Sequence, residues 1–67
     1  MSILDKIGRR IAKLRHEKGL TQEDLAGLAE MDRSYLSEIE NGQKNLSVLA
    51  LLKIAKALRA DPANLLK

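Results

Sequence analysis

The sequence predicts an all-α domain of five short helices, and two observations support this. Leu (13), Ala (8) and Ile (5) make up most of the apolar residues, and both Ala and Leu are strong helix formers. The apolar residues recur three and four positions apart, in runs that mostly begin after a capping residue and end near Gly or Pro. A chain of 67 residues is enough for one domain, which we expect to span residues 1–67.

The composition excludes several kinds of protein. The chain has no cysteine, so it can hold neither a disulfide framework nor a thiolate zinc site. No apolar run approaches the roughly 18 residues of a membrane span, and charged residues interrupt the N-terminus where a signal peptide is apolar. We therefore expect a cytoplasmic protein with no membrane partner, metal, cofactor or small-molecule ligand. The net charge of +3 makes an acidic partner such as DNA plausible.

The first helix is predicted over Ile3–Lys18. Gly19 follows it and supplies the left-handed residue that commonly ends a helix. The basic residues of this helix lie mostly off the apolar stripe, and they form either a solvated face or a peripheral contact to phosphates. The stripe itself has the spacing of one helical face: Ile3, Ile7, Ile11 and Leu14.

Arg15 directly follows the apolar stripe of the first helix, so it is expected at the edge of the core. An unpaired buried charge is costly, so this side chain requires an anionic partner. Glu40 is the candidate, because it lies near the end of the predicted third helix.

The second helix is predicted over Gln22–Ala29. Thr21 is a good N-cap, and Asp24 in the first turn favours the positive end of the helix dipole. Leu25 and Leu28 are expected to be buried.

The third helix is predicted over Arg33–Glu40, with Asp32 as N-cap. Leu36 and Ile39 are its inward residues. Only about three residues separate it from the second helix. Two short helices joined so tightly form a helix-turn-helix pattern, here over residues of about 21–41.

The fourth helix, Val48–Leu58, begins after the N-cap Ser47 and has more apolar surface than one small core can cover. A helix that is apolar over most of its circumference is central to a core or faces a partner. A short fifth helix starts at Asp61-Pro62. Its leucines extend the apolar surface, and an exposed patch of this kind usually marks an interface, here expected over residues of about 46–67.

Two segments carry a resemblance to a known family. Thr21–Ala26 (TQEDLA) and Ser34–Gly42 (SYLSEIENG) resemble the Cro and phage-repressor helix-turn-helix family, also called the XRE family. Asp32–Tyr35 is similar to the controller proteins of restriction–modification systems. The resemblance implies a five-helix, lambda-repressor-like fold. It also implies a homodimeric transcriptional regulator that recognises an inverted repeat in double-stranded DNA, and that either activates or represses.

The resemblance assigns roles to matching positions. It implies base contacts in the major groove from the third helix: Arg33, Ser34, Tyr35 and Glu38. It implies phosphate contacts from the second helix and the loop after the third: Gln22, Asn41, Gln43, Lys44, Asn45 and Ser47. Arg15 and Glu40 match a structural ion pair of the family. The dimer interface is expected to include four leucines of the last two helices: Leu49, Leu52, Leu65 and Leu66.

Several of these residues have a second interpretation from chemistry alone. Arg33 suits guanine, because a guanidinium can bond both O6 and N7. Its second interpretation is a solvated arginine, which the positive end of the helix dipole disfavours. Tyr35, the only aromatic residue, either contacts DNA or packs on the core, and Glu38 either accepts from cytosine or repels misplaced phosphates. Glu30 departs from the family, which usually has Gly there, so either the turn differs or Glu30 bears strain.

The residues do not favour an enzyme. His16 is the only histidine, it lies among charged neighbours, and we expect it to be exposed. Neither a second histidine nor a cysteine nor a convergent carboxylate pair supports catalysis. The alternative function is a protein-interaction module on the same fold, such as an antitoxin that masks a partner protein.

Overall fold

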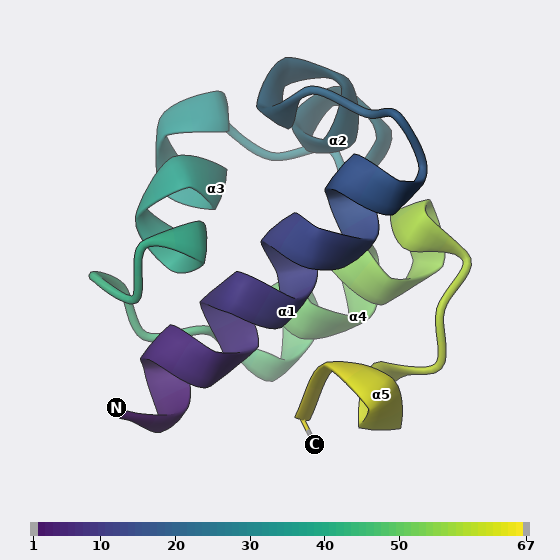
Figure 1. The fold of residues 1–67 in the computed structure, drawn as a ribbon. Coiled ribbons are helices and arrows are strands. Elements are labelled where there is room, and N and C mark those ends of the chain that lie inside the picture. The colour runs from purple at the N-terminus through teal and green to yellow at the C-terminus, as the bar shows by residue number, and fades with distance from the viewer. Residues whose placement is uncertain (1, 67) are drawn as a thin grey trace.

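A computed structural model describes residues 2–66 of the chain. These residues form five α-helices and no strand: α1 (Ile3–Glu17), α2 (Gln22–Leu28), α3 (Arg33–Glu40), α4 (Val48–Leu58) and α5 (Pro62–Leu66). Figure 1 shows α1 crossing the middle of the fold, with α3 on one side of it and α5 on the other. The predicted all-α class is therefore confirmed. The first two helices each end one residue before the predicted boundary, because Lys18 and Ala29 are capping residues.

The first four helices end in the same way, with a residue in the left-handed region directly after the last turn. Gly19 and Gly42 supply it after α1 and α3, at φ of 69° and 72°. Glu30 and Arg59 supply it after α2 and α4, at φ of 55° and 54°. At each end, the N–H of the left-handed residue and the N–H of the residue after it donate back to carbonyls of the last turns. These tight ends keep the links between helices short, and they show that Glu30 bears the strain of a position that favours Gly.

The core lies where α1, α4 and α5 meet the helix-turn-helix pair. Its largest fully buried side chains come from all five helices: Ile11, Leu25, Leu36, Ile54, Leu58 and Leu65. Gly8 allows α1 and α3 to approach closely, because a Cβ on Gly8 would lie 2.5 Å from the carbonyl oxygen of Glu40. Such a contact is too short for real atoms. This glycine therefore sets how closely α3 packs on α1, a role that no sequence pattern indicated.

Two predictions about burial are wrong. Leu28 is 60% exposed, because the inner face of α2 consists of Leu25 with the small residues Ala26 and Ala29. Leu28 points to the side of that face. Leu65 is 0% exposed, because α5 folds back against α1 and α4 and places this side chain in the core. Leu65 therefore stabilises the single protomer and is not available for the dimer contact predicted for it.

The apolar stripe of α1 is only partly confirmed. Ile7 and Ile11 are buried and Leu14 is half-buried, whereas Ile3 at the start of the helix is exposed. No helix within residues 2–66 is long and apolar enough to cross a membrane.

Candidate nucleic-acid interface

In the helix-turn-helix pair, one part of α3 is buried and the other is exposed. Leu36 and Ile39 are buried, as predicted, and they fasten the helix to the core. Arg33 and Ser34 in the first turn are exposed. The helix is therefore anchored along one side and at one end, and its first turn faces solvent.

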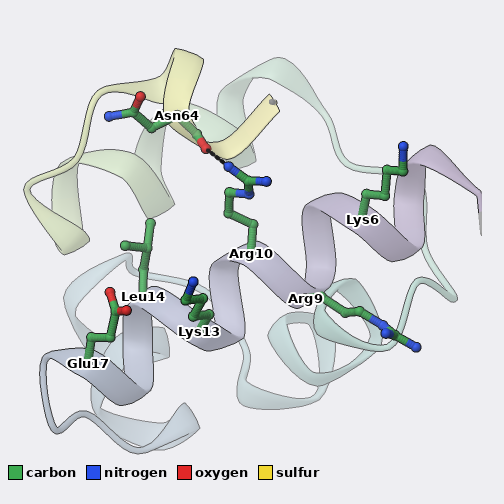
Figure 2. Close-up of a pocket in the computed structure, with 7 residues that line it drawn as sticks. All are labelled: Lys6, Arg9, Arg10, Lys13, Leu14, Glu17 and Asn64. Carbon is green, nitrogen blue, oxygen red and sulfur yellow. Dashed lines mark hydrogen bonds between the residues drawn. The ribbon is translucent and has the colours of Figure 1, made fainter.

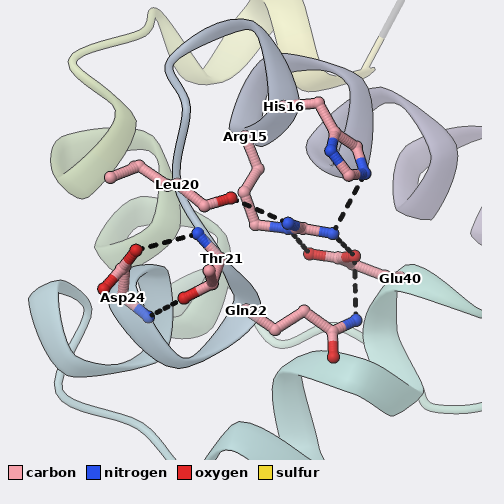
Figure 3. A network of polar contacts seen from close by, with 7 residues as sticks. All are labelled: Arg15, His16, Leu20, Thr21, Gln22, Asp24 and Glu40. Carbon is pink, nitrogen blue, oxygen red and sulfur yellow. Dashed lines mark hydrogen bonds and ion pairs between the residues drawn. The ribbon is translucent and has the colours of Figure 1, made fainter.

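A buried ion pair joins α1 to the end of α3 (Figure 3). The Arg15 guanidinium donates from Nε to Oε2 of Glu40 at 2.8 Å and from Nη2 to Oε1 at 3.0 Å. Its Nη1 donates to the carbonyl oxygen of Leu20 at 2.8 Å. The pair is fork-to-fork, the strongest geometry for these two groups. The predicted pairing of Arg15 with Glu40 is present, and it fixes α3 against α1 and the start of α2.

Gln22 extends this network from α2. Its side-chain amide donates to Oε1 of Glu40 at 3.1 Å. An amide has one further N–H and a carbonyl oxygen, so the half-buried Gln22 keeps polar capacity for an outside partner. His16 lies at the edge of the network, with Nε2 at 3.4 Å from Nη2 of Arg15. A guanidinium only donates, so in this contact Nε2 is the acceptor. His16 is otherwise exposed, as expected.

The N-terminus of α2 is well capped. Asp24 N–H donates to Oγ1 of Thr21 at 3.0 Å, and Thr21 N–H donates to Oδ2 of Asp24 at 2.9 Å. The hydrogen bonds from the Thr21 backbone and then its side chain lower the pKa of Asp24 below its usual value. A carboxylate with a depressed pKa in the folded state adds stability that is present above its unfolded pKa and is lost as the pH falls through the folded one.

The N-terminus of α3 differs from that of α2. Asp32 occupies the predicted N-cap position, but its side chain makes no hydrogen bond to the helix backbone. Ser47 does cap α4, accepting from Ala50 N–H at 3.0 Å. The first turn of α3 therefore combines N–H groups that no side chain caps with the Arg33 guanidinium. Both kinds of group attract anions.

A shallow depression of about 520 Å³ lies between the end of α1, the start of α2 and the start of α3. It brings Gln22 and Arg33, two of the residues predicted to contact DNA, to one place. Its lining residues are Arg15, His16, Gly19, Leu20, Thr21, Gln22, Glu23 and Arg33.

The other predicted contact residues follow α3 and the loop after it. Tyr35 and Glu38 are half-buried, and Tyr35 packs against the core. Part of the Tyr35 side chain therefore packs on the core, which was the alternative to DNA contact, and the rest stays accessible. The predicted phosphate-contact residues after α3 are all exposed: Asn41, Gln43, Lys44, Asn45 and Ser47.

A second exposed surface is apolar and lies on α4 and α5. Leu49, Leu52 and Leu66, three of the four leucines predicted for the dimer interface, are 49% to 63% exposed. Val48 is 73% exposed and adds to the surface at the start of α4, although it was not in the predicted set. Monomeric proteins seldom expose several large apolar side chains on neighbouring elements.

The fold and the exposed first turn of α3 define a helix-turn-helix protein, and comparison with known proteins gives the family. A family model described as a helix-turn-helix domain matches residues 6–66. The chain belongs to this helix-turn-helix family. Within residues 2–66, no group of His, Asp and Glu side chains could hold a metal ion.

Several relatives within this family are control proteins of restriction–modification systems. The control protein C.MunI from Mycoplasma sp is 44% identical over 54 residues, which cover 79% of this chain and 73% of the relative. The restriction–modification controller protein C.AhdI from Aeromonas hydrophila superposes with a TM-score of 0.91 at 48% identity, over 92% of this chain and 94% of the other. The restriction–modification controller protein C.Esp1396I, solved as a tetramer with its natural 35 base-pair operator, superposes with a TM-score of 0.85 at 43% identity, over 91% and 80%.

These findings confirm the resemblance predicted from the two sequence segments, including the similarity to controller proteins. The family consists of transcriptional regulators rather than enzymes, as the sequence predicted.

Proposed function

We propose that this protein is a sequence-specific DNA-binding transcriptional regulator that acts as a homodimer on an inverted-repeat operator, and that it is a control protein of a restriction–modification system. Its partners are then double-stranded DNA and a second copy of the chain. The observation that carries the proposal is the exposed first turn of α3, with Arg33 and Ser34 in solvent, on a helix whose other end is fixed by a buried ion pair. Because a regulator works where the chromosome lies, we also propose a cytoplasmic location.

Recognition of base sequence falls to α3. The major groove is about 12 Å wide and admits an α-helix. Arg33 leads the helix and can donate two hydrogen bonds to one guanine. Ser34 lies beside it, and the accessible parts of Tyr35 and Glu38 come next along the helix.

Groups outside α3 position the protein on the duplex. Gln22 reaches the groove edge from α2, and its side chain is oriented by Glu40. The loop after α3 offers exposed polar and basic side chains, of which Lys44 carries the charge. Contacts of this kind fix register and orientation on the phosphates without reading sequence.

Dimerisation falls to the exposed apolar surface of α4 and α5. Covering Leu49, Leu52 and Leu66 with the same surface of a second copy removes apolar area from water, which favours association. A two-fold dimer presents two copies of α3 about 34 Å apart, one turn of DNA, and so selects two half-sites in inverted order. Occupancy of the operator then depends on the concentration of the protein.

The test compares two variants on DNA selected from a random pool and on random duplex. Arg33→Ala is expected to remove about 1–3 kcal/mol of preference for the selected sequence. Lys44→Ala is expected to weaken binding to both duplexes alike, and to reduce the slope of log K against log salt by about one. Fluorescence anisotropy over a series of salt concentrations measures both quantities.

Two results would count against the proposal. The first is an equal loss from both variants on selected and random DNA, which would mean that Arg33 reads no base. The second is the absence of any DNA binding that strengthens as salt falls. That outcome would favour the protein-interaction module described above.

A further inference from the structure

One hollow of the described surface lies away from the helix-turn-helix pair. It has a volume of about 700 Å³ and runs between α1 and α5. Figure 1 shows that α5 and α3 lie on opposite sides of α1, so this groove does not share a side of α1 with α3. Its lining residues are Lys6, Arg9, Arg10, Lys13, Leu14, Glu17 and Asn64 (Figure 2).

Four of these residues form one row along α1. Lys6, Arg10, Lys13 and Glu17 follow each other at steps of four, three and four residues. This spacing places them on one helical face, over roughly 16 Å of helix. All four are exposed. The row therefore carries three positive charges followed by one negative charge.

The groove beside this row has a defined shape. Arg10 Nη1 donates to the carbonyl oxygen of Asn64 at 3.4 Å and so bridges α1 and α5. Leu14 is half-buried and adds an apolar contact between the charged positions. The hollow is lined mostly by charged side chains, with Leu14 as an apolar contact. A partner is therefore selected here mainly by complementary charge.

We propose that this groove binds an acidic amphipathic helix of another protein. Acidic residues of the partner face Lys6, Arg10 and Lys13, and a basic residue faces Glu17. The change of sign at Glu17 favours a protein over nucleic acid, because a phosphate chain is negative along its whole length and is repelled there. The proposal adds a protein contact to the DNA and dimer contacts of the proposed function, and it uses a different surface.

The probe is a fluorescein-labelled helical peptide with the pattern K-A-A-A-E-A-A-E-A-A-A-E, which matches the row in antiparallel order. The full-length protein is titrated against it at low salt, and anisotropy reports binding. The double variant Lys6→Glu with Lys13→Glu is expected to weaken binding about tenfold, since two attractive charge pairs are lost. The matched control, Lys18→Glu with Arg59→Glu, has the same net charge and alters two exposed positions outside both the groove and the proposed dimer surface. It is expected to bind as the unchanged protein does.

A charge exchange tests the alignment. The variant Glu17→Lys is expected to bind the first peptide less tightly, and to bind tightly again when glutamate replaces the lysine of the peptide. All these substitutions are at exposed or half-exposed positions, and circular dichroism checks that each variant keeps its helices. Both peptides must also bind when the protein is saturated with selected DNA.

Three results would overturn the proposal. One is no binding of the peptide by the unchanged protein. Another is equal binding of a peptide with the same composition and a scrambled order, which would show a general attraction to negative charge. The third is a loss of random-duplex binding by the α1 double variant that matches its loss of peptide binding. That result would assign the groove to nucleic acid.

Discussion

The C-terminal end of α3 lies among buried groups, whereas its N-terminal end carries exposed polar side chains. At the C-terminal end, Glu40 is buried and bonded to Arg15 and Gln22, and Gly8 lets the α1 backbone come close. At the N-terminal end, Arg33 is exposed and Asp32 leaves the helix uncapped. The difference separates the buried, fixed end of this eight-residue helix from the end that we propose reads DNA. Changes at one end should alter stability, and changes at the other should alter binding.

The largest effect is expected from Glu40→Ala, which breaks the buried end of α3. It leaves the Arg15 guanidinium buried without its anion, a change that typically costs about 3–5 kcal/mol. Since native domains are stable by only about 5–15 kcal/mol, much of the fold's stability would be lost. Urea denaturation followed by circular dichroism measures the free energy of unfolding.

The control for this prediction replaces both partners with apolar residues of similar size. Arg15→Met with Glu40→Leu removes the charge and its partner together, so it is expected to cost far less than Glu40→Ala alone. If the double variant is as unstable as the single one, the ion pair does not account for the rigidity of this end.

A smaller effect is expected from Gly8→Ala, which forces α1 away from α3. The added Cβ meets backbone carbonyl oxygens of Ile39 and Glu40, which cannot rotate out of the way as a flexible side chain would. Overpacking of this kind costs typically about 1–3 kcal/mol. The midpoint of urea denaturation should fall accordingly.

Gly27→Ala is a matched control on α2. A Cβ on Gly27 meets no atom within 4 Å. The substitution therefore only improves helix propensity, which stabilises by roughly 0.5–1 kcal/mol. Opposite signs for the two glycines would show that contact with α3 decides the effect. The same sign would contradict the importance of the close approach.

Local signals in the sequence predicted much of this arrangement. Thr21, Ser47 and Gly19 act through their immediate neighbours, so their positions predict the helix ends. The partner of Arg15 was predictable for a different reason. A charge beside an apolar stripe must be paired, and Glu40 was the candidate near the end of the third helix.

Features that depend on the tertiary arrangement were not predictable in this way. Leu28 is exposed because α2 packs through small residues, and a pattern of leucines does not reveal which side a short helix presents. Leu65 is buried because α5 folds back on α1, a direction that no local signal sets. The role of Gly8 requires knowledge of which backbone lies opposite it. The proposed DNA contacts also depend on a partner, so neither the sequence nor the fold alone tests them.

The smallest effect is expected from Glu30→Gly, in the turn that leads to the free end of α3. Glu30 has a φ of 55°, where a side chain costs roughly 1–2 kcal/mol and glycine is unstrained. Glycine also loses more chain entropy on folding, by roughly 0.5–1 kcal/mol, so the net gain is about 0.5 kcal/mol. The hydrogen bonds of Glu30 N–H to Gly27 and of Met31 N–H to Ala26 come from the backbone, and they remain. The unfolding midpoint should therefore rise slightly while the affinity for selected DNA changes little, because the turn is relaxed without moving. A change in sequence preference would instead mean that strain at Glu30 positions Arg33, and that the free end of α3 is set by the turn as well as by the buried end.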